Sequence, residues 1–140
     1  MYEFLTLRVS DAMTRDVITI GPETPLRDVE ALFERHGFNG VPVVDANGTL
    51  LGFLTKLDLL RACAFSPRSI VPHYEEILEL PARGAMTSCP ETVHPDMALT
   101  RVLEKLVSTR WKSLPVVQDS RVVGIVSRED VLRALRRVAA

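Results

Sequence analysis

Two matching stretches decide the fold: GFLTKLDLL at residues 52–60 and GIVSREDVL at residues 124–132. In both, a glycine precedes two apolar residues, a hydroxyl residue, two variable positions, an aspartate and an apolar pair. This pattern predicts a strand that runs directly into a helix. The hydroxyl residue stands where a helix N-cap is expected. The pairs Thr55/Asp58 and Ser127/Asp130 therefore have the spacing of a capping box, with Asp in place of the usual Glu.

The same pattern also admits a functional interpretation. A helix N-terminus is an anion site, because its N–H groups and dipole favour negative charge. A nearby carboxylate suits a pair of sugar hydroxyls. The four-residue pattern by itself is compatible with capping alone and with ligand binding.

Composition favours an ordinary soluble protein. The chain has 140 residues, 46% hydrophobic and 25% charged, which is enough to bury a core without disulfides. The formal net charge of −1 gives no reason to expect nucleic acid as a partner. Three arginines near the C-terminus are interpreted as a solvated helix face: Arg133, Arg136 and Arg137.

The cysteines and the hydropathy indicate the compartment. Cys63 and Cys89 show neither a Cys-x-x-Cys spacing nor a paired framework, which fits a reducing environment. The first 15 residues lack the features of a secretory signal, and no apolar run approaches the roughly 18 residues of a membrane span. The sequence predicts a cytoplasmic protein without a membrane partner.

The chain contains two copies of one unit. Residues 11–62 match residues 84–134 in register, and the second copy has one residue fewer in its hairpin turn. We expect repeat 1 at residues 1–62, a linker at 63–83 and repeat 2 at 84–140. The matching positions include Ala12-Met13-Thr14 with Ala85-Met86-Thr87, Pro22 with Pro95, Pro42-Val43-Val44 with Pro115-Val116-Val117, and Leu60-Arg61-Ala62 with Leu132-Arg133-Ala134.

Each repeat is predicted to have the order β-α-β-β-α, giving an α+β fold with two layers. In repeat 1, Thr24 is expected to cap the first helix and Gly37 to end it. The Asn-Gly pair at 47–48 predicts a hairpin turn. The expected elements are strands at 17–20, 41–44 and 50–54 and a helix from Thr55 in repeat 1; strands at 114–117 and 122–126 and a helix through Leu135 in repeat 2; and a short linker helix at 75–80.

The order of these motifs resembles the cystathionine β-synthase (CBS) domain. Ala-Met-Thr, an apolar helix, Pro-Val-Val and Gly-h-h-[Ser/Thr]-x-x-Asp, where h is apolar, occur in that order twice. Two such domains in tandem resemble a free-standing Bateman module. The resemblance implies a pseudo-two-fold pair with two clefts that bind adenosine-containing ligands.

In that family a cleft combines the helix start of one repeat with the first strand and the pre-Pro-Val-Val turn of the other. Asp would accept from the ribose diol, and the hydroxyl, the helix N–H groups and a basic side chain would hold phosphate. One implied cleft joins Ser127, Arg128 and Asp130 to Val17, Ile18, Phe38, Asn39 and Val41. The other joins Thr55, Lys56 and Asp58 to Pro90, Glu91, Trp111, Lys112 and Leu114.

Several of these residues have a simpler interpretation. Phe38 and Trp111 precede buried strands and fit a core role equally well. Lys56, Arg128 and Lys112 fit ordinary surface charges. No histidine has metal-ligand spacing, and no motif places a nucleophile beside a base, so we expect neither a metal site nor an enzyme.

The resemblance therefore implies a regulatory, ligand-sensing module with no obligatory cofactor. AMP, ADP, ATP, NAD and S-adenosylmethionine are the candidate ligands. The alternative is a structural or dimerisation module with vestigial clefts. We expect a homodimer, and a weaker Asp58 cleft, because Pro90 offers no N–H and Glu91 adds negative charge.

Overall fold

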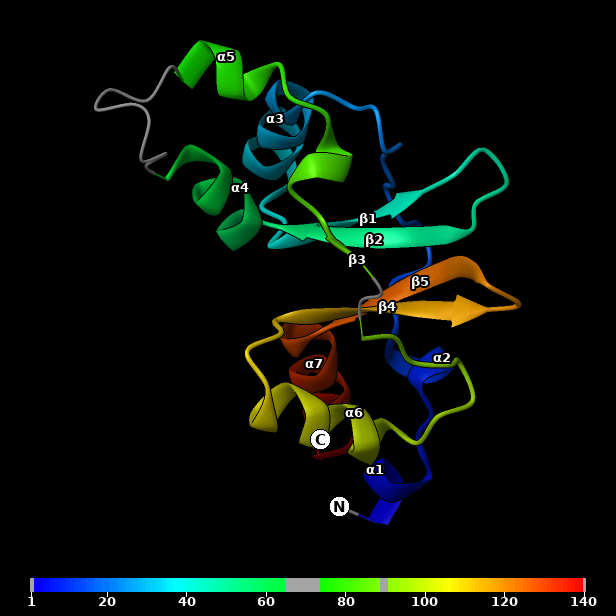
Figure 1. Cartoon of the computed structure of the whole chain (residues 1–140). Coiled ribbons are helices and arrows are strands. Elements are labelled where there is room, and N and C mark those ends of the chain that lie inside the picture. Colours follow the sequence, from blue (N-terminus) through cyan, green and yellow to red (C-terminus); the bar gives the residue numbers. More distant parts are fainter. Residues whose placement is uncertain (1, 65–73, 89–90, 140) are drawn as a thin grey trace. The chain divides into compact units, whose positions relative to one another are not determined.

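The computed structural model describes residues 2–64, 74–88 and 91–139. The chain forms two compact units, and their composition differs from that of the sequence repeats. One unit is continuous and comprises Ile18–Pro90. The other is discontinuous and combines Met1–Val17 with Glu91–Ala140. The first seventeen residues therefore belong with the second repeat. Helices cover one face of the sheet in each unit (Figure 1), which confirms the predicted two-layer α+β architecture.

The continuous unit, 18–90, is built on an antiparallel sheet of order β1-β2-β3. Ile20 adds a parallel bridge to Val43 at the β1 edge. The apolar stripe of α3, including Leu26, Val29 and Phe33, is buried against this sheet. The elements are α3 (Leu26–His36), β1 (Gly40–Val44), β2 (Leu50–Thr55), α4 (Lys56–Cys63), α5 (Tyr74–Leu78), the 3₁₀ helix η1 (Ala82–Gly84) and β3 (Thr87–Ser88).

The discontinuous unit repeats this plan. The hairpin β4–β5 is extended by a parallel bridge from Val93 to Val116 and an antiparallel bridge from Thr14 to Ile125. Leu99, Val102 and Leu106 of α6 are buried in its core. The elements are α1 (Tyr2–Thr6), α2 (Val9–Ala12), α6 (Leu99–Ser108), β4 (Ser113–Gln118), β5 (Arg121–Ser127) and α7 (Arg128–Ala139).

A short segment that ends with each Ala-Met-Thr motif packs on the sheet of the other sequence repeat. We call residues 7–14 the first lead-in and residues 80–87 the second lead-in. In the first, the Leu7 carbonyl accepts from the N–H of Leu99 (3.0 Å) and the N–H of Val9 donates to Met97 (2.9 Å). In the second, the Leu80 carbonyl accepts from the N–H of Leu26 (2.9 Å), and the N–H of Ala82 donates to the Thr24 carbonyl (2.8 Å). The exchange of lead-ins is thus reciprocal.

The repeated glycines allow this packing. A Cβ on Gly52 would lie 2.6 Å from the Met86 sulfur and 2.8 Å from the Thr87 carbonyl oxygen. A Cβ on Gly124 would lie 2.8 Å from the Met13 sulfur and 2.9 Å from the Thr14 carbonyl oxygen. The Met-Thr pair of one repeat therefore packs so closely on the glycine of the other that a side chain at the glycine would clash with it.

The structure corrects three details of the predicted elements. Thr24 does not cap α3: its hydroxyl accepts from the N–H of Gly21 (3.1 Å), and the Leu80 carbonyl serves the first helical N–H instead. The strand expected at 17–20 is reduced to the bridge at Ile20, because Gly21 and Pro22 follow it directly. Helix α7 continues past Leu135 to Ala139. Gly37 ends α3 in the left-handed conformation (φ 66°), as predicted.

The short helix α5 is tied to α3 through a side chain. The Tyr74 hydroxyl donates to Glu30 Oε2 at 3.1 Å. This bond to a carboxylate raises the pKa of the Tyr74 phenol, because the protonated form is the donor. The α5 segment confirms the predicted short linker helix, which begins one residue earlier and ends two residues earlier than the expected range 75–80.

Candidate functional site

The start of α4 is a complete capping box. The N–H of Asp58 donates to Thr55 Oγ1 at 3.1 Å, and the N–H of Thr55 donates to Asp58 Oδ2 at 2.9 Å. The Thr55 hydroxyl also donates to Asp58 Oδ2 at 3.0 Å. The predicted capping role is confirmed, and the carboxylate is held at the helix start with 6% of the residue exposed.

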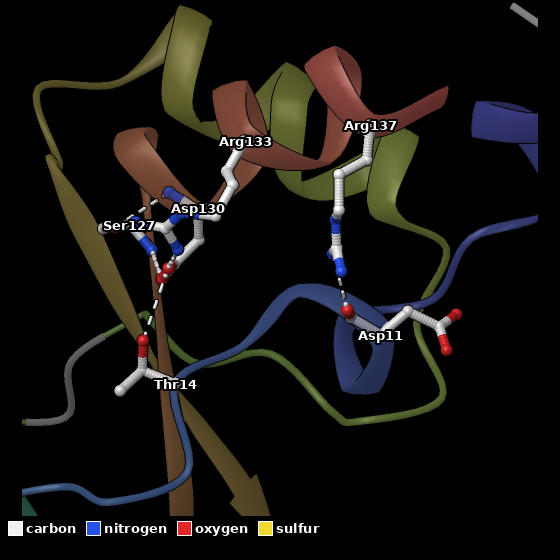
Figure 2. Close-up of polar contacts among 6 residues, drawn as sticks. All are labelled: Asp11, Thr14, Ser127, Asp130, Arg133 and Arg137. Carbon is white, nitrogen blue, oxygen red and sulfur yellow. Dashed lines mark hydrogen bonds and ion pairs between the residues drawn. The ribbon is translucent and has the colours of Figure 1, made fainter. Parts of the chain in front are cut away.

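The start of α7 has the same box with two further donors (Figure 2). The N–H of Asp130 donates to Ser127 Oγ at 3.1 Å, and the N–H of Ser127 donates to Asp130 Oδ2 at 2.9 Å. Asp130 Oδ1 accepts from the Arg133 guanidinium at 3.0 Å and from the Thr14 hydroxyl at 3.3 Å. Only 4% of Asp130 is exposed. The Ser127 N–H, the Arg133 guanidinium and the Thr14 hydroxyl together satisfy one buried carboxylate.

An arginine follows each of these aspartates by one helical turn. Arg61 lies 3.7 Å from Asp58 Oδ1, whereas Arg133 lies 3.0 Å from Asp130 Oδ1. Both arginine side chains are more than half exposed, whereas the aspartates are buried. Each arginine therefore places a positive charge at the surface beside a buried carboxylate. Each helix start therefore combines a hydroxyl, a carboxylate and a guanidinium, which is a set that can bind hydroxyls and phosphate.

The turn before Pro-Val-Val lies beside the helix start of the same unit. The N–H of Lys56 donates to the Asn39 carbonyl at 3.0 Å, and the N–H of Arg128 donates to the Lys112 carbonyl at 3.0 Å. The structure thus brings Asn39 together with Lys56 in unit 18–90, and Lys112 together with Arg128 in the discontinuous unit. The cross-repeat clefts implied by the family resemblance remain a prediction.

The other predicted site residues occupy varied environments. Phe38 stacks on His36 with ring centroids 4.8 Å apart and an interplanar angle of 11°. Val41 and Leu114 are buried core residues paired with Leu54 and Val126. Trp111 is half-buried against the core of the discontinuous unit. Val17 and Ile18 are half-buried; Val17 belongs to the discontinuous unit and Ile18 is the first residue of unit 18–90.

Glu91 is neutralised by a neighbour. Its carboxylate is paired with the Lys105 ammonium of α6, within its own unit. Pro90, the other residue on which the weaker Asp58 cleft was predicted, lies outside the described residues. The weaker Asp58 cleft stays a prediction, and the negative charge of Glu91 on which it partly rests is paired with Lys105.

Sequence reasoning missed Thr14, Arg61 and Arg133 as members of these clusters. All three lie in motifs that occur twice: Thr14 in Ala-Met-Thr, and the arginines in Leu-Arg-Ala. The arginines stand three residues after an aspartate on a predicted helix, a spacing that places two side chains on one face. That signal was available in the sequence. The Thr14 contact had no comparable local signal.

Metal-binding clusters and membrane-spanning helices are both absent from residues 2–64, 74–88 and 91–139. No group of three His, Cys, Asp or Glu side chains there is arranged to hold a metal ion. None of the helices in that part of the chain combines the length and apolar composition needed to cross a membrane.

Comparison with known proteins gives relatives of varied size. L-aspartate semialdehyde sulfurtransferase of Methanocaldococcus jannaschii is 32% identical over 126 residues, covering 89% of this chain and 22% of that protein. An inosine-5′-monophosphate dehydrogenase of Korarchaeum cryptofilum is 28% identical and 23% covered. The chain thus spans about a quarter or less of these curated relatives.

Solved structures match over nearly their whole length. CBSX2 of Arabidopsis thaliana in complex with AMP has a TM-score of 0.81 and 27% identity, over 95% of this chain and 98% of that one. The CBS domain pair of MJ0100, in complex with 5′-methylthioadenosine and S-adenosyl-L-methionine, has a TM-score of 0.77 and 26% identity, over 94% and 98%. The CBS domain model itself matches residues 9–64 and 82–137. With two matches that together span most of its residues, this chain belongs to the CBS domain family as a tandem pair.

Proposed function

We propose that this chain is a regulatory module that binds an adenosine-containing ligand at the helix starts of Asp58 and Asp130. The observation that carries the proposal is the buried carboxylate at each helix start, held beside a hydroxyl and an arginine. Similar CBS pairs are complexed with AMP and with S-adenosylmethionine, which supports ligands of this class. The module is regulatory and carries out no reaction of its own.

Each group at a helix start has a distinct task in this proposal. The aspartate accepts hydrogen bonds from the paired ribose hydroxyls, which a charged acceptor strengthens. The helix N-terminus attracts the phosphate, with Lys56 or Arg128 adding charge at the first helical position. Apolar side chains such as Phe38, Val17 and Ile18 are proposed to hold adenine, as in the implied clefts.

The alternative function is a structural or dimerisation module with vestigial clefts. One observation favours it: both carboxylate oxygens of Asp130 accept hydrogen bonds from groups of the protein itself. In that case the aspartates act only as helix caps, and nucleotides have no effect on stability.

A ligand screen by thermal denaturation separates the two functions. AMP, ADP, ATP, NAD and S-adenosylmethionine are titrated against the whole chain, with GMP as the matched control for the base. A ligand at 100 times its dissociation constant stabilises the folded state by about 2.7 kcal/mol. We expect at least one adenosine ligand to raise the melting temperature in a concentration-dependent way. Unchanged melting with all five up to millimolar concentration contradicts the proposal.

We also propose that the module is a homodimer. Leu60 on α4 and Leu132 on α7 occupy equivalent positions in the two repeats and are 66% and 58% exposed. Leu57, also on α4, is half exposed. Isologous contact between two copies buries such equivalent apolar positions. A cytoplasmic location completes the proposal, because the two cysteines show no disulfide spacing.

Light scattering tests the dimer. We expect twice the chain mass of 15.6 kDa at micromolar concentration, and the single-chain mass for the double variant Leu60→Ser/Leu132→Ser. The matched control is Val107→Ser, since Val107 is an exposed apolar residue on α6 and lies outside the proposed interface. A wild-type mass of one chain contradicts the dimer and leaves the ligand proposal standing.

A further inference from the structure

Helix α7 holds the first lead-in at two points (Figure 2). The Arg137 guanidinium donates to the Asp11 carbonyl at 3.3 Å, and the Thr14 hydroxyl donates to Asp130 Oδ1 at 3.3 Å. Between these points Ala12 is buried. The end of the lead-in is therefore fastened to the same carboxylate that is proposed to receive the ligand.

The two aspartates differ in how their oxygens are used. Asp130 Oδ1 accepts from two donors, Thr14 and Arg133, and Oδ2 accepts from the Ser127 N–H. A carboxylate oxygen offers about two lone-pair sites, so Oδ1 of Asp130 is fully used. In Asp58, Oδ2 accepts from both the N–H and the hydroxyl of Thr55. In the part of the chain that the structure describes, the one partner of Asp58 Oδ1 is Arg61, at 3.7 Å. A ligand hydroxyl can reach Asp58 Oδ1 without displacing a hydrogen bond, but must displace one to reach Asp130 Oδ1.

The equivalent of Thr14 in the second lead-in is Thr87. It pairs with Phe53 as Thr14 pairs with Ile125, so the backbone geometry is the same. Among the described residues, however, no hydrogen bond joins the Thr87 hydroxyl to Asp58. The hydroxyl-to-aspartate contact thus distinguishes the two otherwise matching sites.

We propose that Thr14 sets the affinity of the Asp130 site by competing with the ligand for Asp130 Oδ1. Ligand binding releases the Thr14 hydroxyl, and the end of the first lead-in loses one of its two ties to α7. The Arg133 pair stays, because its exposed guanidinium can share the carboxylate while adjusting its position. This inference rests on the proposed ligand function. The competition lowers the affinity of the Asp130 site, and so runs against the prediction from Pro90 and Glu91 that the Asp58 cleft is the weaker one.

The test measures AMP binding by calorimetry in an Asp58→Asn background, which leaves the Asp130 site to be read alone. Thr14→Val removes the donor and keeps the side-chain shape, so we expect AMP to bind about three- to tenfold more tightly. Thr14→Ser keeps a hydroxyl and is expected to bind as the background does. Thr87→Val, the matched control at the equivalent position, is expected to change affinity less than twofold. Circular dichroism melting of each variant verifies folding.

Unchanged or weaker AMP binding by Thr14→Val, beside measurable binding by the background protein, overturns the competition and leaves the ligand function intact. A Thr87→Val effect equal to that of Thr14→Val also overturns it, since the two threonines are then equivalent. Absence of AMP binding by the wild type and by every variant overturns both proposals. Binding that appears only on Thr14→Val supports the competition, because the removed donor was then the obstacle.

Discussion

At the scale of single residues, Asp130 combines an observed role, that of helix cap, with a proposed role, that of ligand acceptor. Asp130→Asn keeps the shape and some capping ability but removes the charge that Ser127, Thr14 and Arg133 share. We expect a loss of unfolding free energy of about 0.5–2 kcal/mol, the range for a lost cap. We expect a loss of about 1.5–3 kcal/mol in nucleotide binding, the range for hydrogen bonds to charged groups. Thermal denaturation and calorimetric titration measure the two losses.

The matched variant is Asp58→Asn, which has the same cap and, within the described ranges of the chain, no hydrogen bond from Thr87, the equivalent of Thr14. If Asp130→Asn melts lower but binds nucleotide as tightly as the wild type, the carboxylate is only a cap. Capping itself was predictable, because Ser127 and Asp130 lie three positions apart. The Thr14 contact was not, since 116 positions separate it from Asp130 and only the folded sheet brings them together.

At the scale of secondary structure, each strand that pairs with a lead-in needs a glycine at the point of contact. These glycines are Gly52 in β2 and Gly124 in β5. Gly124→Ala would place a Cβ 2.9 Å from the Thr14 carbonyl oxygen, and backbone cannot move aside as a flexible side chain can. We expect a loss of unfolding free energy of about 1–3 kcal/mol, the range for overpacking. Urea denaturation measures it.

Gly84→Ala is the control for this prediction, because no atom lies within 4 Å of a Cβ at Gly84. Equal stability of Gly124→Ala and wild type would show that the Met13-Thr14 segment is not held against the strand. We expect Gly84→Ala to change stability by less than about 0.5 kcal/mol, the usual limit for surface changes.

The sequence predicted the helices and hairpins well, because their apolar periodicity and turn residues are local. Gly37 and the Asn-Gly turn are examples, with φ 66° at Gly37 and 82° at Gly48. It failed at the start of α3. Thr24 is a good N-cap residue by type, but the Leu80 carbonyl, more than fifty positions away, takes the first N–H. Propensity was overridden by a distant backbone group.

At the scale of the whole molecule, the continuity of unit 18–90 has a measurable consequence. A fragment of residues 18–90 retains the second lead-in, and with it the Leu80 bond to α3 and strand β3. A fragment of equal length, residues 1–73, carries the first lead-in instead and lacks the sheet on which that segment packs. We expect 18–90 to fold cooperatively and 1–73 not to fold as a monomer.

Circular dichroism with urea denaturation, repeated over a range of protein concentrations, compares the two fragments. Folding of 1–73 only at high concentration agrees with the prediction, since two copies then exchange lead-ins. A concentration-independent transition for 1–73, as cooperative as that of 18–90, would contradict it. The sequence identified the repeats, but it could not show which lead-in each sheet receives, because both lead-ins carry the same Ala-Met-Thr motif.

The reciprocal exchange of lead-ins also bears on ancestry. The backbone hydrogen bonds Leu99 to Leu7 and Leu26 to Leu80 join equivalent positions of the two repeats. Two identical single-repeat chains would therefore make both bonds. Such chains would have formed an obligate, segment-swapped dimer. Joining two such repeats in one polypeptide would leave each half free to diverge. Among the described residues, the Thr14–Asp130 contact has no counterpart at Thr87, a difference that two identical chains could not carry.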